Sequence, residues 1–332
     1  MKYDKIYFED VVKRLETDGF AIGAVNPKEY HSWKPLLAER LGVPVTSKSD
    51  LADFAACPLR WKYNKEQGLS KSSAALRMGS MVDCLTLTPE LFDQEYALAW
   101  QASEPLMVQL KKDGTPYKDG RQDAEQKAAW DAARAEHEES CAALQVEIVS
   151  EAELEKAKGI AGRATEHLAE RGLMLGETFQ SQVAMWVCLR SVGGVPLACP
   201  VVVTGMMDIL PLEGGSIWDL KTTSMPVENE QKLMYTLEDF HYGVQAALYT
   251  DMFNLCTGEE RDEFSFLFVG TGELPVLSRE VTLQSEALDF YRAMYERWLV
   301  AFALACATQD FGVPTQERVF YSPSARERKK SV

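Results

Sequence analysis

The sequence lacks paired cysteines. Its seven cysteines stand singly along the 332-residue chain, and no two of them form a C-x-x-C pair. This spacing predicts reduced thiols that pack as small apolar side chains. Free thiols are typical of a reducing compartment, so we expect a cytoplasmic protein. The cysteines are Cys57, Cys84, Cys141, Cys188, Cys199, Cys256 and Cys306.

Long hydrophobic runs are also missing. The first residues, Met1-Lys2-Tyr3-Asp4-Lys5, contain no apolar segment, so we expect no secretory signal. The longest apolar run, near residues 298–307, is too short to cross a bilayer and predicts a buried helix. With 46% hydrophobic and 26% charged residues, the chain has the composition of a globular protein with a large core. We therefore expect no membrane partner.

Several familiar catalytic motifs are absent. The chain has no P-loop, no G-x-S-x-G elbow, no H-E-x-x-H motif and no G-x-G-x-x-G loop. These absences exclude the common signatures of P-loop nucleotide binding, serine hydrolysis, zinc proteolysis and dinucleotide binding. The four histidines are dispersed along the chain, at His31, His137, His167 and His241.

Positive charge is scarce, with 35 Lys and Arg against 50 Asp and Glu, and the formal net charge is −15. Net charge governs long-range repulsion, whereas the binding of a polyanion depends on the local patch. Between residues 59 and 82 the balance is reversed, because only Glu66 opposes five basic side chains. Those side chains are Arg60, Lys62, Lys65, Lys71 and Arg77.

The most informative stretch that is present predicts a β-hairpin with two carboxylates. Residues 201–210 and 217–221 have the composition of strands, and Gly214-Gly215 supplies a turn. Asp208 and Asp219 would then lie near the ends of adjacent strands, beside Lys221. A divalent cation relieves the repulsion between such carboxylates, and hard oxygen ligands favour Mg²⁺ or Mn²⁺. D-x-K alone also fits a surface hairpin with an Asp219–Lys221 salt bridge.

The spelling G-x-x-D followed by D-x-K-T-T resembles the PD-(D/E)XK nuclease superfamily, in its RecB-like and RecE-like branch. The resemblance implies an α/β fold with a restriction-endonuclease-like core, in which a mixed central sheet is flanked by helices and carries a helical insert. It implies that Asp208 and Asp219 ligate a metal ion together with the Leu220 carbonyl. Lys221 would position the attacking water.

A second signal lies far from the hairpin, at residues 47–61. The pattern predicts a helix that has Ser49 as its N-cap and that Pro58 ends. The string S-x-S-x-L, then F, then C-P and a basic-aromatic pair is similar to the first motif of RecB-like and RecE-like nucleases. The residues that we expect to contact DNA, without reading its sequence, are Ser47, Ser49, Arg60, Lys62, Lys65 and Arg77.

Two positions depart from the family pattern. In the helix predicted over residues 74–85, Asp83 stands where the family has the histidine of G-x-x-x-H. An aspartate can ligate Mg²⁺ but cannot act as a neutral donor; an exposed helix residue is the alternative for Asp83. In the strand predicted over residues 179–187, Gln182 stands where the family often has a glutamate. Glutamine can hydrogen-bond a water or a phosphate but is a weak cation ligand.

The pair Gln245 and Tyr249 completes the expected catalytic set. Residues 242–249 predict a helix that carries both side chains on one face at i,i+4 spacing. The Q-x-x-x-Y element resembles one that follows the D-x-K strand in these nucleases and contacts DNA or orients the lysine. A polar pair on a surface helix is the alternative. Residues 264–269 predict a further core strand, and residues 285–308 a long outer helix.

We divide the chain into a helical lead-in (1–45), a nuclease domain (46–320) and a basic tail (321–332). A polar helical insert spans about residues 102–171, with helices over 123–141 and 150–171 and a capping box at its Ser150-Glu151-Ala152-Glu153 sequence. Some relatives hold an iron–sulfur cluster. The matching cysteine cluster near the C-terminus is missing here, so we expect no cluster.

The resemblance implies a metal-dependent exodeoxyribonuclease that hydrolyses linear duplex DNA in phage or prophage recombination. It implies Mg²⁺ or Mn²⁺ as cofactor, duplex DNA ends as substrate, a single-strand annealing protein as partner and a ring of three or four copies. Two alternatives stay open. One is a catalytically weakened DNA-end-binding protein, which Asp83 and Gln182 motivate. The other is a structure-specific endonuclease, because motifs define the chemistry and not the shape of the substrate.

Overall fold

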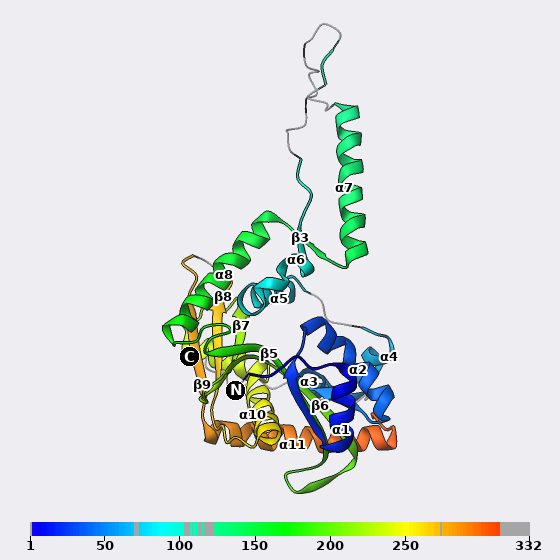
Figure 1. The fold of residues 1–332 in the computed structure, drawn as a ribbon, viewed down its shortest axis with the longest axis vertical. Helices are drawn as coiled ribbons and strands as arrows, with labels where there is room; N and C mark the ends of the chain where they lie inside the picture. Colours follow the sequence, from blue (N-terminus) through cyan, green and yellow to red (C-terminus); the bar gives the residue numbers. More distant parts are fainter. Residues whose placement is uncertain are drawn as a thin grey trace, which may run out of the picture.

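The computed structural model describes residues 2–69, 73–102, 107, 109–111, 115, 123–272 and 274–312. It contains a mixed seven-stranded sheet in the order β1-β5-β6-β7-β8-β9, with β2 paired to β6 (Figure 1). The predicted α/β fold with a mixed central sheet is therefore confirmed. The strands are β1 (Phe20–Ala24), β2 (Val45–Ser47), β5 (Phe179–Val192), β6 (Val195–Pro211), β7 (Ile217–Thr223), β8 (Phe264–Gly270) and β9 (Ser278–Leu283).

The middle of the sheet is the antiparallel pair β5 and β6. Residues 183–187 and 201–205 are buried at every position, as expected for strands that helices cover on both faces. β6 and β7 form the predicted hairpin, with Gly214 and Gly215 at φ values of 87° and 81° that favour glycine. β7 runs parallel to β8, and β8 is antiparallel to β9.

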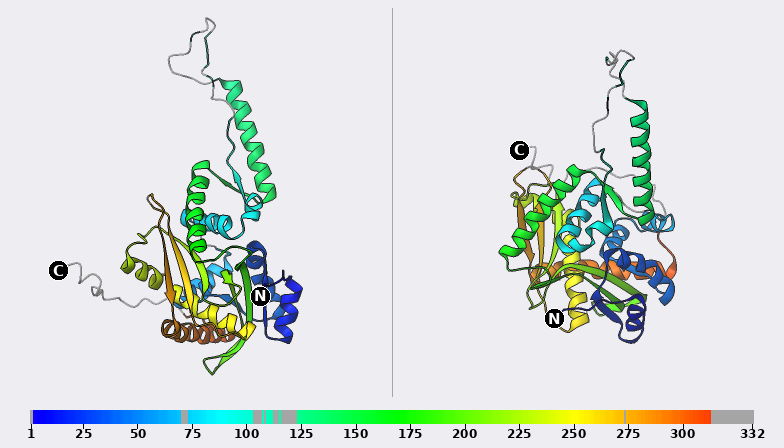
Figure 2. Two further views of the ribbon diagram at one scale, coloured as in Figure 1. Left: turned by 60° about the vertical axis from the view of Figure 1, so that its left-hand side comes forward. Right: turned by 45° about the horizontal axis from the view of Figure 1, so that its top comes forward.

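Helices cover both faces of the sheet (Figures 1 and 2). On one face, α3, α10 and α11 pack over β5 and β6 in one apolar cluster; on the other, α5 and α8 pack over β7 and β8 in a second. Asp208, Asp219 and Lys221 therefore come from strands in the covered interior of the fold. The helices are α1 (Phe8–Thr17), α2 (Pro27–Leu41), α3 (Lys48–Ala56), α4 (Pro58–Glu66), α5 (Ala74–Leu87), η1 (Pro89–Leu91), α6 (Phe92–Glu95), α7 (Ala124–Leu144), α8 (Glu151–Glu170), α9 (Glu230–Asp239), α10 (Tyr242–Thr257) and α11 (Ser285–Thr308).

The N-terminal residues, expected as a helical lead-in over 1–45, also extend the sheet. β1 pairs antiparallel with β5, and α2 packs over this edge through Tyr30 and Trp33 against Trp186. The lead-in therefore shares a core with the strands that follow it.

Within the insert, α7 forms an arm that projects from the body, whereas α8 packs over the sheet (Figures 1 and 2). A small parallel pair, β3 (Tyr96–Leu98) with β4 (Glu147–Val149), lies at the base of this arm. The two predicted insert helices are confirmed as α7 and α8, and the predicted capping box joins Ser150 and Glu153 in both directions. Among the described residues of α7, only Cys141 is buried, so this helix presents most of its surface to solvent.

One predicted helix boundary is wrong. Ser49 lies inside α3, and Ser47 occupies the N-cap position without making a cap hydrogen bond. The Ser47 hydroxyl is used elsewhere, because it bonds the side chains of Lys34 and Asp50. Pro58 opens α4 at its first turn after α3 has ended at Ala56. The predicted tail, residues 321–332, lies outside the described residues.

Across the parts of the chain that the structure describes, none of the helices combines the length and apolar character that a membrane span requires.

Candidate active site

Asp208 and Asp219 lie opposite each other on neighbouring strands. The one ladder pair of β6 with β7 is Ile209 with Trp218, and continuing that register places Asp208 across from Asp219. Asp208 Oδ2 accepts a hydrogen bond from the Leu220 N–H at 3.1 Å. The Asp208 side chain therefore accepts a hydrogen bond from the backbone of β7 just beyond the last ladder pair of the hairpin.

Asp219 is held through both of its carboxylate oxygens. Lys221, two residues along the same face of β7, contacts Oδ2, and Gln245 of α10 donates its side-chain amide to Oδ1. Asp219 is only 2% exposed and Gln245 only 7%. The alternative of an exposed surface salt bridge for D-x-K is therefore wrong, and so is that of a surface polar pair for Gln245.

The Lys221 ammonium is the positive charge of this cluster. Burial alone would lower the pKa of Lys221, but the carboxylates of Asp219 and Asp208 outweigh burial and raise it. Lys221 therefore stays charged at neutral pH. Its ammonium can hold a water molecule or stabilise negative charge on a phosphate oxygen.

Asp83 of α5 interacts electrostatically with the same cluster. Burial raises the pKa of Asp83 to about 7, with the Lys221 ammonium lowering it and the Asp219 carboxylate raising it further. α5 can come close to β7 because residue 79 is glycine, and a Cβ there would lie 3.3 Å from Thr222 Oγ1. Gly79 therefore lets α5 lie close to the strand that carries Asp219 and Lys221.

Gln182 lies beside Asp208 on the other neighbouring strand. The β5–β6 ladder pairs Ser181 with Ile209 and Val183 with Met207, so Gln182 falls opposite Asp208. Its φ of 53° is in the left-handed region that side-chain-bearing residues seldom adopt. Gln182 is 8% exposed, and its Oε1 finds no hydrogen-bond partner in the described structure. Strained backbone of this kind gathers at functional sites.

Tyr249 supports the strand that carries Asp208. Its ring packs against the backbone of Gly205, where a Cβ would lie 2.7 Å from Tyr249 Cε1. Gly205 of the G-x-x-D motif therefore contacts Tyr249 of the Q-x-x-x-Y motif. Burial raises the pKa of Tyr249 well above its usual value, so its hydroxyl stays protonated.

The donor set suits a divalent cation. Asp83, Asp208 and Asp219 share one ammonium, and burial together with the neighbouring carboxylate of Asp219 raises the pKa of both Asp83 and Asp208. Apart from its ion pair with Lys221, Asp219 Oδ2 accepts no hydrogen bond from the described residues. Hard oxygens with excess negative charge are the ligands that Mg²⁺ and Mn²⁺ prefer.

Within the described ranges, however, no three or more His, Cys, Asp or Glu side chains form a group that could hold a metal ion. A cation would therefore need an oxygen besides the carboxylates of Asp208 and Asp219. The Leu220 carbonyl is the candidate that the family resemblance supplies.

The serines expected to contact DNA bond to a charged cluster on α2 and α3. Ser47 Oγ accepts a hydrogen bond from Lys34 Nζ at 2.9 Å and donates one to Asp50 Oδ2 at 3.0 Å. Ser49 Oγ lies 3.2 Å from Ser47 Oγ. Lys65 Nζ lies 2.7 Å from Asp50 Oδ1. The buried Asp50 therefore neutralises part of the basic charge that the sequence places here.

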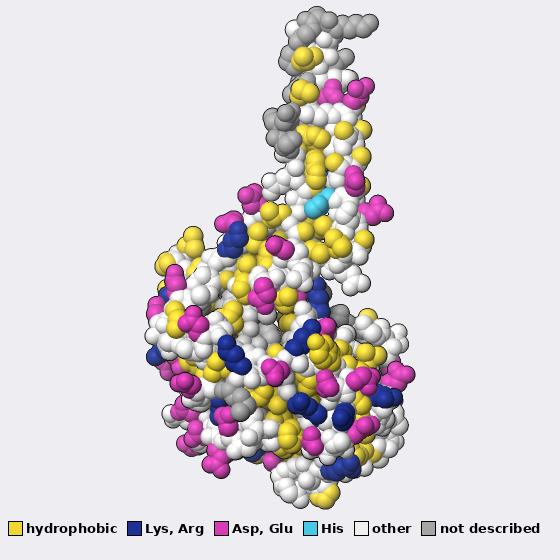
Figure 3. Space-filling view, in the orientation of Figure 1, with side chains coloured by type: hydrophobic (Ala, Val, Ile, Leu, Met, Phe, Trp, Pro, Cys, Tyr) yellow, Lys and Arg dark blue, Asp and Glu magenta, His cyan; other side chains and the backbone are white. Residues whose placement is uncertain are grey.

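The other expected DNA contacts are divided between two places. Arg60 and Lys62 lie on α4, where Lys62 Nζ is 3.8 Å from Glu66. Arg77 lies on α5 and pairs with Glu153 and Glu147 beside a cavity of about 510 Å³. Basic and acidic side chains are interspersed over the face shown in Figure 3.

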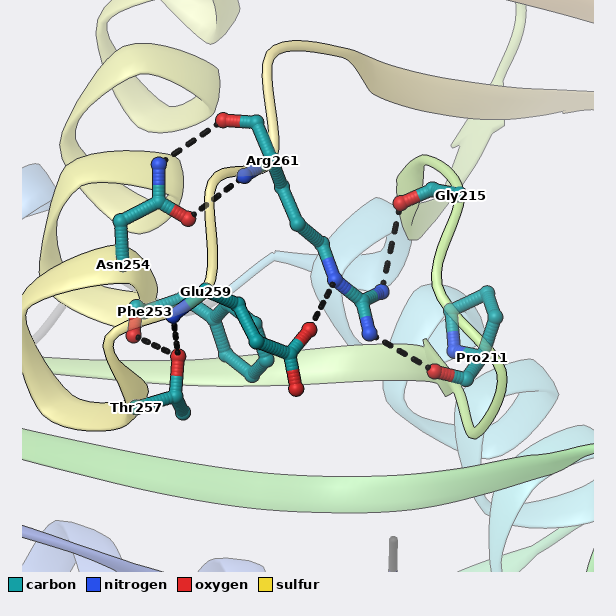
Figure 4. A network of polar contacts seen from close by, with 7 residues as sticks. All are labelled: Pro211, Gly215, Phe253, Asn254, Thr257, Glu259 and Arg261. Carbon is teal, nitrogen blue, oxygen red and sulfur yellow. Dashed lines mark hydrogen bonds and ion pairs between the residues drawn. The ribbon is translucent and has the colours of Figure 1, made fainter.

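Sequence reasoning missed Arg261, which fixes the hairpin turn. Its buried guanidinium donates to the Pro211 carbonyl at 3.1 Å and to the Gly215 carbonyl at 3.3 Å, and pairs with Glu259 (Figure 4). Pro211 ends β6 and Gly215 lies in the turn before β7, so Arg261 ties the end of β6 to the turn that leads into β7. The only available signal was a single arginine within the acidic run E-E-R-D-E.

Comparison with solved structures gives a neighbour that aligns with this chain over nearly its whole length. It is the crystal structure of "Putative exonuclease" from Eubacterium rectale, with 15% identity, a TM-score of 0.50, and coverage of 92% of this chain and 98% of that chain. At this identity the likeness shows the fold alone. Rai1 from Scheffersomyces stipitis aligns with 11% identity and a TM-score of 0.30, over 93% of this chain and 67% of its own.

Comparison with family models gives a match over most of the chain. The matching model describes a PDDEXK-like domain of unknown function and covers residues 47–303, from Ser47 through the hairpin to α11. No curated protein matches the chain. On the extent of the family match, the chain belongs to the PDDEXK-like family DUF3799.

Proposed function

We propose that this protein is a metal-dependent deoxyribonuclease that hydrolyses phosphodiester bonds of linear duplex DNA from its ends. The observation that carries the proposal is the group formed by the buried Asp219 with the half-buried Asp208 and Lys221, in which Gln245 holds the Asp219 carboxylate. Membership of the PDDEXK-like family supports nuclease chemistry. The choice of DNA ends as substrate rests on the resemblance of the sequence motifs to those of RecE-like nucleases.

Each side chain has a role in this proposal. Asp208 and Asp219 would hold Mg²⁺ or Mn²⁺ together with the Leu220 carbonyl, and Asp83 would add negative charge nearby. When bound, such a cation lowers the pKa of a coordinated water and stabilises the leaving oxygen. Lys221 orients the attacking water toward the phosphate, and Gln245 keeps the Asp219 carboxylate in one orientation.

A second candidate function is DNA-end binding without efficient cleavage. The strained Gln182, opposite Asp208 where relatives often have a carboxylate, favours it because an amide is a weak cation ligand. Retention of Asp208, Asp219 and Lys221 argues for catalysis. Isothermal titration with Mg²⁺ or Mn²⁺ separates the two, since a pseudoenzyme would bind no metal even when DNA is present.

The wider setting is also a proposal from the resemblance. We expect a role in phage or prophage recombination, with the product strand passed to a single-strand annealing protein. A ring of three or four copies would let basic side chains line a channel, which would reconcile DNA binding with a net charge of −15.

The direct test is digestion of linear and covalently closed circular duplex DNA with Mg²⁺ or Mn²⁺, beside the Asp219→Ala protein. Metal-dependent loss of the linear DNA only, absent in the variant, supports the exonuclease. Cutting of the circle would indicate the structure-specific endonuclease, and no cleavage of either would leave the DNA-binding protein.

A further inference from the structure

A ladder of aromatic rings leads from the core to the surface beside Lys221. The Tyr242 ring lies against Phe266 and Phe268 of β8, with ring centroids 5.5 and 6.0 Å apart. Phe240 stacks on Tyr242 with a centroid distance of 5.6 Å and an angle of 18° between the ring planes. Phe240 itself is 60% exposed. The ladder therefore ends in a phenyl ring open to solvent.

Two lysines connect this ladder to the candidate active site. Lys221 Nζ lies 5.3 Å from the Tyr242 ring centroid, and Lys48 Nζ lies 5.1 Å from the same centroid. Lys48 also donates to the Phe240 carbonyl at 2.6 Å. One cluster around Tyr242 thus contains the exposed Phe240 ring, the Lys48 ammonium and Lys221. The Lys48 ammonium can bind a phosphate, and Lys221 is proposed to orient the attacking water.

The backbone of this segment is fixed. Phe240 caps the end of α9, and Tyr242 begins α10. Between them His241 adopts a left-handed φ of 53°, and its ring packs edge-on against Trp298 at 5.2 Å. This sharp turn places the rings of Phe240 and Tyr242 against each other. The protein therefore loses little conformational freedom when a flat group binds to the Phe240 ring.

We propose that Phe240 stacks on an unpaired nucleobase adjoining the scissile phosphate, with Lys48 at a neighbouring phosphate. This inference rests on the proposed nuclease function and specifies its substrate as a frayed or single-stranded DNA end. A base inside a duplex is covered on both faces by its neighbours, whereas a base that has left the stack offers a free face. Aromatic side chains beside cationic ones bind such bases without regard to sequence.

The test compares Phe240→Ala with Phe240→Leu, Phe240→Trp and Phe290→Ala. Leucine keeps an apolar side chain without a ring, tryptophan keeps the stacking surface, and Phe290 is a similarly exposed phenylalanine on α11, 65% exposed. The probes are a blunt duplex and a duplex with an unpaired overhang that carries 2-aminopurine, with Ca²⁺ in place of Mg²⁺. Binding is followed by fluorescence anisotropy and stacking by quenching of 2-aminopurine.

Phe240→Ala and Phe240→Leu should bind the overhang duplex about tenfold more weakly than wild type and leave 2-aminopurine unquenched. Phe240→Trp and Phe290→Ala should behave like wild type, and binding of the blunt duplex should change little. Equal losses on blunt and overhang DNA, or wild-type quenching in Phe240→Leu, would overturn the stacking role. If the wild-type protein neither binds nor cleaves any DNA with Mg²⁺ or Mn²⁺, the proposed function itself fails.

Discussion

The ring of Tyr249 packs so closely on the Gly205 backbone that a Cβ at residue 205 would lie 2.7 Å from Tyr249 Cε1. This contact joins α10, which supplies Gln245, to β6, which supplies Asp208. Two motifs far apart in the sequence therefore support each other, and the distance between strand and helix at the candidate site depends on one glycine.

Gly205→Ala should destabilise the protein by about 1–3 kcal/mol, because overpacking a buried contact moves the ring or the strand. Gly159→Ala is the matched control, since Gly159 lies in α8 and a Cβ there meets nothing within 4 Å. That control should be neutral or stabilising by about 0.5–1 kcal/mol. Urea unfolding of both variants measures the difference, and equal stabilities would show that Tyr249 moves aside without cost.

Lys221→Ala should abolish DNA cleavage and leave DNA binding nearly intact, because this ammonium is proposed to orient the attacking water. Lys158→Ala, which removes an exposed lysine paired with Glu155 on α8, should keep full activity. Cleavage rates and anisotropy titrations on the same oligonucleotide provide the comparison. Parallel loss of binding and cleavage in Lys221→Ala would point to misfolding.

Gln182→Glu should tighten Mg²⁺ binding, because it adds a carboxylate on the strand position opposite Asp208. The gain should be several-fold in dissociation constant, measured by isothermal titration calorimetry in the presence of DNA. Gln101→Glu adds the same charge at an exposed position after β3 and should leave metal affinity unchanged. An identical affinity in all three proteins would place residue 182 outside the metal site.

Asp83 should make stability depend on pH in metal-free protein. Its pKa of about 7 in the folded state lies above the ordinary value of 3.8, so the folded state binds the proton more tightly. Its stabilising contribution is complete below about pH 4 and is lost as pH rises through 7, by at most about 1.4 kcal/mol per pH unit. Urea unfolding with EDTA at pH 5 and pH 8 should show a smaller decrease for Asp83→Asn than for wild type. Equal decreases would remove Asp83 from this role.

Joint reversal of Arg60 and Lys62 to glutamate should weaken DNA binding and make its salt dependence shallower. The log–log slope should fall by about one for each phosphate that the protein no longer neutralises. Arg134→Glu on α7 reverses a charge that pairs with Asp131 and Glu138, away from α4, and should bind DNA as wild type does. Anisotropy titrations over a range of salt concentrations measure the slope, and an unchanged slope for the double variant would take α4 off the DNA path.

Local patterns were sufficient to predict the main elements. The strand and turn composition around Asp208 and Asp219 gave the β6–β7 hairpin, and the serine–glutamate spacing gave the start of α8. Such signals succeed because hairpin turns and helix caps involve residues only a few positions apart. The same logic failed at Ser49, since the neighbouring Ser47 hydroxyl bonds to Lys34 and Asp50 instead of capping a helix.

The sequence by itself determined which side chains of the site are carboxylate, amide and ammonium, and their order along two strands and a helix. Only the tertiary structure decided that Gln245 holds Asp219, that Gln182 lies opposite Asp208 in a strained conformation, and that Arg261 ties the end of β6 to the turn that leads into β7. The physical reason is that these contacts depend on strand register and on helix packing over the sheet. Both are set by burial of the whole core and not by neighbouring residues.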